Sequence, residues 1–311
     1  MLAGRNPAAR ARARRALGLL LGWTQSSDSP WSSSTLTMHG SPVEFGFDSR
    51  GDALRYCVEI DDPGNHPGTR LPQAIRLLAR VGATGVDDSV LHQMQRLQAA
   101  RVLRFGAWIG GRHTPDADRY KLYVEVPAES AAEAHQWSAT IAGPLSLPGG
   151  QRCRVGLIGY DVNSRRIEFY YRGRNLLPTT IALLLRRAEM EWRMGEVIDC
   201  LERVYRFSRA GRLPSRDVGF SYATPIDGGE ATFSIYFFCL ALFGGDGSAR
   251  GRILQLAAAH DWRMSAYERL SEPIASARGT PTRHGMLGVV LRPEAAVGIT
   301  VGLSPPEGTV A

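Results

Sequence analysis

Lys121 is the only lysine among 311 residues, and it lies in a segment of alternating character at residues 119–126. Lys121, Tyr123 and Glu125 fall on one face of this segment, while leucine and valine fall on the other. Such alternation predicts a β-strand with one apolar face and one face of charged and aromatic side chains. An ammonium group beside a phenol ring is suited to binding an anion and to stabilising a nearby carbocation.

Other alternating segments carry the same kinds of side chain on their polar faces. Arginine and lysine bind phosphate through charge-assisted hydrogen bonds, and aromatic rings stabilise a cation through their faces. Ionisation of an allylic diphosphate needs both, because the leaving group must be neutralised and the allyl cation must be kept from water. The cations in question are Arg55, Arg104, Lys121, Arg154 and Arg166, and the tyrosines are Tyr123, Tyr170 and Tyr236.

The elements that must position these residues form a repeating pattern. Short turns join the alternating segments in pairs, so we predict five antiparallel hairpins. Segments with apolar residues at helical spacing separate the hairpins, which gives a helix–helix–strand–strand unit used five times. The predicted strands span residues 42–48, 53–60, 102–109, 119–126, 153–160, 166–171, 218–222, 232–238, 284–291 and 296–302. The predicted helices span residues 71–80, 88–99, 130–141, 178–209, 249–260 and 265–277.

The two faces of these strands predict how the sheet closes. One face is almost wholly apolar and matches the apolar sides of the helices. The other is polar, charged, aromatic or small, and unpaired charges in a dry core would be strongly unfavourable. Closure also removes exposed sheet edges. We therefore predict an α+β fold: a ten-stranded antiparallel β-barrel built from five ααββ repeats, with helices outside and a solvent-filled lumen. The alternative is a lumen of mutually satisfied salt bridges that binds no ligand.

Composition sets further bounds on the chain. A net charge of +7 favours an anionic partner, either nucleic acid or a phosphorylated small molecule. The four cysteines show no metal-binding spacing and no disulfide framework, so we expect a reducing, cytoplasmic setting. The apolar run at residues 17–21 is too short to cross a membrane, and we interpret residues 5–23 as an amphipathic helix rather than a targeting segment.

Two organisational expectations follow. Residues 1–38 would form an N-terminal helix and a Ser-rich linker, and residues 39–311 a single barrel domain that acts as a monomer. Nucleic acid is not expected as a partner, because the cations lie on the face opposite the apolar one and a closed barrel does not admit a polynucleotide.

From about residue 42 onward, the chain resembles the ABBA-type aromatic prenyltransferases. Pro42-Val-Glu-Phe followed by residues 54–59 is similar to the opening hairpin of that family. Lys121-Leu-Tyr123 resembles its Lys-x-Tyr strand, and Arg166-x-Glu168-x-Tyr170 resembles its Arg-x-Lys-x-Tyr strand with Glu in the middle position. Ser234-x-Tyr236 falls where a Gln-x-Tyr pair is common.

The resemblance implies roles for individual residues. Glu44 would contact the nucleophilic acceptor and act in catalysis. Arg55, Lys121 and Arg166 would bind the diphosphate, with Arg104 and Arg154 as further candidates. A carbocation shield would consist of Tyr123, Tyr170 and Tyr236, and candidate acceptor-binding residues are Trp108, Ser234 and His284.

Within the family, Ile158-Gly-Tyr-Asp161 followed by Ile167-Glu-Phe-Tyr170 is similar to the cyanobactin-type branch. That branch prenylates side chains of ribosomal peptides and uses magnesium, so the resemblance implies a cyclic peptide acceptor, a dimethylallyl or geranyl donor, and Mg²⁺, with Glu168 as a candidate metal ligand. In the last strand, Gly298 and Thr300 replace tyrosines that often close the shield, which favours a wider opening. The alternatives are a small aromatic acceptor such as an indole or phenol, and a non-catalytic basic barrel that binds a phosphorylated ligand.

Overall fold

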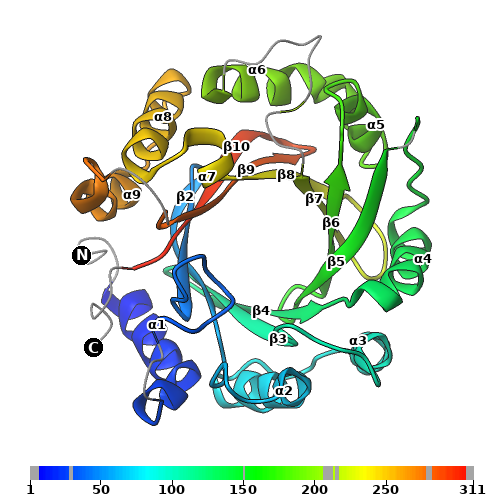
Figure 1. Ribbon diagram of the computed structural model, residues 1–311, viewed down its shortest axis with the longest axis vertical. Coiled ribbons are helices and arrows are strands. Elements are labelled where there is room, and N and C mark those ends of the chain that lie inside the picture. The colour runs from blue at the N-terminus through cyan, green and yellow to red at the C-terminus, as the bar shows by residue number, and fades with distance from the viewer. Residues whose placement is uncertain are drawn as a thin grey trace.

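A computed structural model describes residues 7–27, 31–149, 151–205, 213, 217–277 and 282–305, with only the backbone of Asp217. Ten antiparallel strands close into a barrel in which each strand pairs with its sequence neighbours and β1 pairs with β10 (Figure 1). The predicted barrel and its five hairpins are therefore confirmed. The strands are β1 (Val43–Asp48), β2 (Gly51–Val58), β3 (Ala107–His113), β4 (Asp118–Glu125), β5 (Arg152–Asp161), β6 (Arg166–Arg174), β7 (Asp217–Pro225), β8 (Thr232–Phe238), β9 (His284–Arg292) and β10 (Ala295–Leu303).

Helices surround this barrel on the outside (Figure 1). The repeat is less regular than predicted: in the described part of the chain, one α-helix precedes β1 and one precedes β5, two precede β3 and two precede β7, and three precede β9. None of the described helices is long and apolar enough to span a membrane. The helices are α1 (Pro7–Leu20), α2 (Arg70–Arg80), α3 (Asp88–Gln98), α4 (Ala131–Ala142), α5 (Thr180–Arg186), α6 (Met194–Tyr205), α7 (Cys239–Phe243), α8 (Asp246–Ala259) and α9 (Ser265–Leu270).

The helix expected within residues 5–23 is α1, and it packs against β2, β3 and α2. Its Ala13 and Leu20 side chains are buried against the barrel. Arg12 pairs with Asp118 at the start of β4, with the guanidinium Nε 2.9 Å from the carboxylate. The N-terminal helix is therefore part of the coat around the barrel. Residues 1–6 and 28–30 of the predicted N-terminal segment lie outside the described residues.

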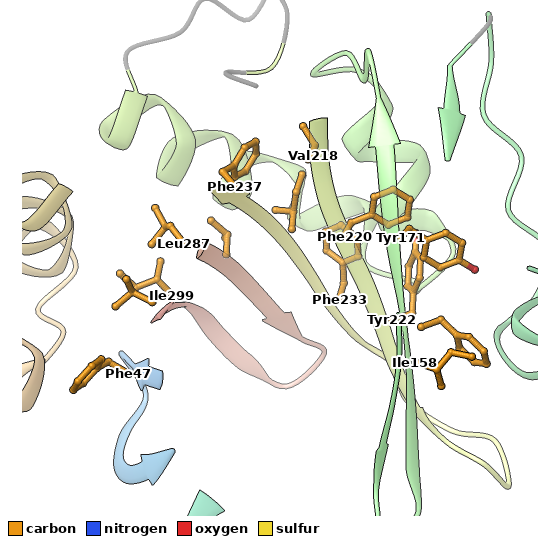
Figure 2. Packing of buried hydrophobic residues seen from close by; sticks show 14 of the residues in the cluster. Phe47, Ile158, Tyr171, Val218, Phe220, Tyr222, Phe233, Phe237, Leu287 and Ile299 are labelled. Atoms are coloured by element: carbon orange, nitrogen blue, oxygen red, sulfur yellow. The ribbon is translucent and has the colours of Figure 1, made fainter. Parts of the chain in front are cut away.

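The apolar face of the strands packs beneath the helices, as the alternation predicts. On β6 and β7, the rings of Tyr171 and Phe220 stack with their centroids 4.9 Å apart, and Tyr222 lies beside them (Figure 2). The Tyr222 hydroxyl donates a hydrogen bond to the Leu184 carbonyl of α5. Full burial of each such side chain contributes roughly 1.5–3 kcal/mol, so this outer layer stabilises the barrel and leaves the inner face for polar groups.

The boundaries of β3 differ most from the prediction. The strand expected at residues 102–109 begins at Ala107 and continues to His113. The Glu125 carboxylate accepts hydrogen bonds from the backbone N–H groups of Arg104, Phe105 and Gly106, at 2.7–3.0 Å. These donors are thereby withdrawn from the β-ladder, and the chain joins the sheet only after Gly106.

Two helices are also shorter than predicted. The helix expected at residues 178–209 is broken, because α5 ends at Arg186, Glu189 adopts a positive φ of 56°, and α6 begins at Met194. Residues 206–209 of that prediction lie outside the described residues. The helix expected at residues 265–277 ends at Leu270, just before a 3₁₀ turn that contains Pro273, a residue with no backbone N–H to continue the helix.

Candidate active site

The lumen has two chemically different ends. All five hairpin turns lie at one end of the barrel, which we call the hairpin end. On β6, the inward side chains run from Arg166 nearest this end through Glu168 to Tyr170. On β4, Lys121 likewise precedes Tyr123. Cations therefore lie nearer the hairpin end, and tyrosines lie deeper in the lumen.

Lys121 and Glu168 form an ion pair inside the lumen. The Lys121 ammonium donates to Oε2 of Glu168 and to the Tyr170 hydroxyl, at 3.2 Å from the latter. The other carboxylate oxygen, Oε1, accepts from the hydroxyls of Ser221 and Tyr236. Burial would raise the pKa of Glu168, but the charge and hydrogen bonds of Lys121, with Ser221 and Tyr170, hold it below its ordinary value.

Three tyrosines surround this ion pair. The Tyr123 and Tyr170 ring centroids are 6.0 Å apart, and those of Tyr170 and Tyr236 are 6.1 Å apart. The Lys121 nitrogen lies 5.4 Å from the centroids of both Tyr123 and Tyr170. Burial raises the pKa of all three phenols, so they remain neutral. The structure thus brings the predicted carbocation shield together around one space.

Glycines on neighbouring strands make room for these side chains. A Cβ atom at Gly159 would collide with the Lys121 side chain, and one at Gly110 would lie 2.8 Å from the Tyr123 ring. The lumen is reached by solvent, because the side chain of Lys121 is 20% exposed and that of Arg55 is 26% exposed. Both side chains are also ion-paired, Lys121 with Glu168 and Arg55 with Asp48, so the lumen combines salt bridges with access for solvent.

Glu44 on β1 carries a carboxylate on the lumen face. Its side chain is partly buried. Among the described residues, none donates a hydrogen bond to this carboxylate and none forms an ion pair with it. Cβ atoms at Gly285 or Gly302 would collide with its carboxylate, so both glycines create the space it occupies. Burial raises the pKa of Glu44 to about 7. A carboxyl group that titrates near neutrality is well placed to accept a proton.

Arginines gather at the hairpin end. Asp48 is shared by two of them, with Arg50 Nε at 2.9 Å and Arg55 at 2.8 Å from its oxygens. Among the described residues, Arg112 and Arg292 have no ion-pair partner. Burial, together with Arg55 and other guanidinium groups, lowers the pKa of Arg112 to about 10. This excess of positive charge suits a ligand with several negative charges.

Arg166 lies on the same strand as Glu168 and reaches over the adjoining strands. Its guanidinium donates to the carbonyl oxygens of Ala223 and Glu230, at 2.7 and 3.0 Å. Of the predicted diphosphate ligands, Arg55, Lys121 and Arg166 therefore lie toward the hairpin end, and each has a different hydrogen-bond or ion-pair partner.

Sequence reasoning missed Arg50, Arg112 and Arg292. Arg50 lies in the β1–β2 turn, and its side chain lies over Gly298. The room predicted at Gly298 is thus filled by Arg50. Arg112 and Arg292 fall just beyond the predicted ends of their strands. Continuing the alternation from Trp108 past Gly110 would have placed Arg112 on the lumen face.

Arg104 and Arg154 do not join this group. Arg104 is exposed and precedes β3, in the segment that binds Glu125 through its backbone. Arg154 is exposed and pairs in register with Arg172, whereas Lys121 pairs with a residue farther along β5, Asp161. At about 3.3 Å per residue, this separation is roughly 20 Å. Alternation identifies the face of a strand but not the position along the barrel.

His284 was predicted as an acceptor-binding residue and lies outside the lumen. A β-bulge between β9 and β10 places both Gly285 and Met286 opposite Gly302, which turns His284 toward the helices. There Nδ1 lies 2.6 Å from the Asp246 carboxylate and Nε2 lies 2.8 Å from the Tyr267 hydroxyl. His284 therefore ties β9 to α8 and α9.

The other two predicted acceptor-binding residues lie on the lumen face. Trp108 stacks on Phe105 with centroids 3.8 Å apart, and its indole N–H donates to Glu59 at 3.2 Å. Glu59 in turn pairs with the buried Arg70 at 3.1 Å. Ser234 pairs in register with Ser221, next to the ion pair.

The surroundings of Glu168 do not fit a Mg²⁺ site. Magnesium prefers several oxygen ligands, usually carboxylates and water. Glu168 instead contacts an ammonium and two hydroxyl donors. Within the described ranges, no group of three His, Cys, Asp or Glu side chains is arranged to hold a metal ion.

Comparison with known proteins identifies the fold. No protein-family model matches the chain, and no curated protein sequence matches it. It is similar to the apo form of the prenyltransferase PriB, at 18% identity and a TM-score of 0.78 over 99% of this chain and 95% of that one. It is similar to 5-dimethylallyltryptophan synthase from Streptomyces coelicolor, at 20% identity and a TM-score of 0.78 over 100% and 95% of the two chains.

A third similar structure is 6-dimethylallyltryptophan synthase from Micromonospora olivasterospora, at 18% identity and a TM-score of 0.75 over 98% and 95% of the two chains. At these identities the shared property is the fold. The chain thus has the fold of these prenyltransferases over nearly its whole length.

Proposed function

We propose that this chain is a prenyltransferase that moves an allylic prenyl group from its diphosphate to an electron-rich aromatic acceptor inside the barrel. The observation that carries this proposal is the order of groups along the lumen. The reaction needs three functions. Cations at the hairpin end, a tyrosine cage below them, and the Glu44 carboxylate, which has no partner among the described residues, supply them.

The first step is ionisation of the donor. The bond between the allylic carbon and the diphosphate oxygen breaks, and both electrons leave with the oxygen. Lys121, Arg55 and Arg112 would neutralise the charge that develops on the diphosphate. The rings of Tyr123 and Tyr170 would face the allyl cation and exclude water from it.

The second step is attack by the acceptor. A ring carbon or heteroatom of the acceptor donates an electron pair to the allyl cation, which forms the new bond and leaves an excess proton. Glu44 would orient the acceptor by accepting a hydrogen bond from its N–H or O–H group, and it would then take the proton. Its pKa of about 7 leaves a useful fraction of the carboxylate ionised at neutral pH.

An indole is the acceptor that we put first. Two of the similar structures are named dimethylallyltryptophan synthases, and a PriB structure is described as a ternary complex with L-tryptophan and dimethylallyl thiolodiphosphate. A ribosomal peptide acceptor and Mg²⁺ rest on the sequence resemblance alone. Because Glu168 does not fit a metal ligand, no step in this proposal depends on magnesium.

The test is an acceptor panel with purified protein. Dimethylallyl and geranyl diphosphate are each incubated with tryptophan, indole, tyrosine and a cyclic peptide that contains tryptophan, and products are identified by mass spectrometry. We expect a prenylated indole. Lys121→Met should abolish it, whereas Arg154→Met removes a positive charge away from the site and should leave the rate unchanged.

Two other outcomes would change the assignment. Product from the cyclic peptide but not from free tryptophan would favour the peptide branch. Tight binding of the diphosphate with no product from any acceptor would overturn the proposal and favour a non-catalytic barrel that binds a phosphorylated ligand.

A further inference from the structure

The ammonium proposed to bind the donor already has an anionic partner. Lys121 donates to Glu168 Oε2 and to the Tyr170 hydroxyl, and these contacts use two of its three N–H groups. The pair is largely buried, since the Glu168 side chain is 10% exposed and that of Lys121 is 20% exposed. A diphosphate oxygen that binds Lys121 would lie beside the Glu168 carboxylate on the same ammonium, and two anions so close together repel each other.

The two partners are not held equally. Glu168 is anchored through Oε1 by the hydroxyls of Ser221 and Tyr236, which leaves only Oε2 for the lysine. Lys121 has a flexible four-carbon side chain, and among the described residues it donates hydrogen bonds only to Glu168 and Tyr170. The lysine is therefore the partner that moves, and the carboxylate is the partner that stays.

We infer that the lumen contains an anion site whose ligand before donor binding is the chain's own Glu168, and that the donor diphosphate must displace this carboxylate from Lys121. This inference rests on the proposed function and identifies what sets donor affinity. The arginines at the hairpin end draw the diphosphate in, and Lys121 then exchanges Glu168 for a diphosphate oxygen. Glu168 thus lowers the affinity of the site for the donor.

Binding of inorganic pyrophosphate, measured by isothermal titration calorimetry, tests the exchange without any prenyl transfer. Glu168→Gln keeps the size of the side chain but releases Lys121, so we expect pyrophosphate to bind about tenfold more tightly or better. Lys121→Met should weaken binding. In the Lys121→Met background, adding Glu168→Gln should change the affinity by less than about threefold, because no lysine remains to be released.

A matched control separates exchange from simple charge repulsion. Glu294→Gln removes a carboxylate from an exposed turn at the hairpin end without touching the ion pair, so its effect on pyrophosphate binding should stay below about threefold. Circular dichroism verifies that each variant is folded. Glu168→Asp, which shortens the side chain by one methylene, should give an intermediate increase in affinity and serves if the glutamine variant does not fold.

Unchanged or weaker pyrophosphate binding in Glu168→Gln would overturn the inference. Equal tightening with and without Lys121 would also overturn it, because the effect would then be repulsion rather than exchange. The two proposals can fail separately. If no acceptor is prenylated but Glu168→Gln tightens pyrophosphate binding only when Lys121 is present, the transferase proposal is wrong and the anion site stands.

Discussion

Replacement of Glu44 by glutamine tests both the chemistry and the energetics of the lumen. The carboxylate must be ionised to accept a proton, and burial raises its pKa to about 7. Below that pH, kcat/KM for prenyl transfer should therefore rise about tenfold per pH unit, and it should level off near pH 8. Glu44→Gln keeps the shape of the side chain but removes the base. We therefore expect kcat/KM to fall about a hundredfold and to lose its dependence on pH near pH 7.

The same ionisation has a cost in stability that can be worked out. Burial raises the pKa of Glu44 from 4.5 to about 7, a difference of about 2.5 units, which corresponds to at most about 3 kcal/mol. The folded state binds the proton more tightly than the unfolded state, so the folded state holds more protons between about pH 4.5 and 7. Stability conferred by the protonated form is therefore lost as pH rises through that window.

Glu44→Gln has no such proton to lose. Relative to the wild type, the variant should become more stable by up to about 3 kcal/mol as the pH is raised from 5 to 8. Urea unfolding at the two pH values measures this difference, and Glu294→Gln, at an exposed turn position, is the control that should show none. The reasoning is refuted if kcat/KM of the variant still depends on pH near pH 7. It is also refuted if the free energies of unfolding of the wild type and of Glu44→Gln change with pH by the same amount.

Four further changes probe the remaining contacts. Lys121→Met leaves the Glu168 charge without a partner and should lower the free energy of unfolding by about 1–3 kcal/mol, as measured by urea unfolding. Most of this loss should be regained in the double variant with Glu168→Gln. His284→Ala breaks the contacts to α8 and α9 and should lower the free energy of unfolding by about 2–4 kcal/mol, while kcat stays within about threefold. A large loss of kcat with unchanged stability would show instead that His284 acts in the active site. Gly302→Ala should reduce transfer at least about tenfold by displacing the Glu44 carboxylate, whereas Gly251→Ala, in open space on α8, should not. Transfer should persist in EDTA; loss that Mg²⁺ restores would show that the donor needs the ion.

The barrel itself was predictable because strand alternation is a local property of the chain. Each strand needs only a period of two to decide which side chains face the helices and which face the lumen. Lys121, Tyr123 and Tyr170 were assigned to the lumen in this way, and the structure brings them together. The predicted boundaries failed where a distant group intervened, as where the Glu125 carboxylate withdraws the N–H groups of residues 104–106 from β3.

What the sequence by itself determined was the number of hairpins, the two faces of the strands and the types of side chain in the lumen. Tertiary structure alone decided which of those side chains meet. The stagger between strands sets the level of each residue along the barrel, which separates Arg154 from Lys121. A single bulge turned His284 to the outer face, and the register between β4, β5 and β6 brought Glu168 to Lys121. These relations depend on pairing between strands far apart in the chain, and no local pattern records them.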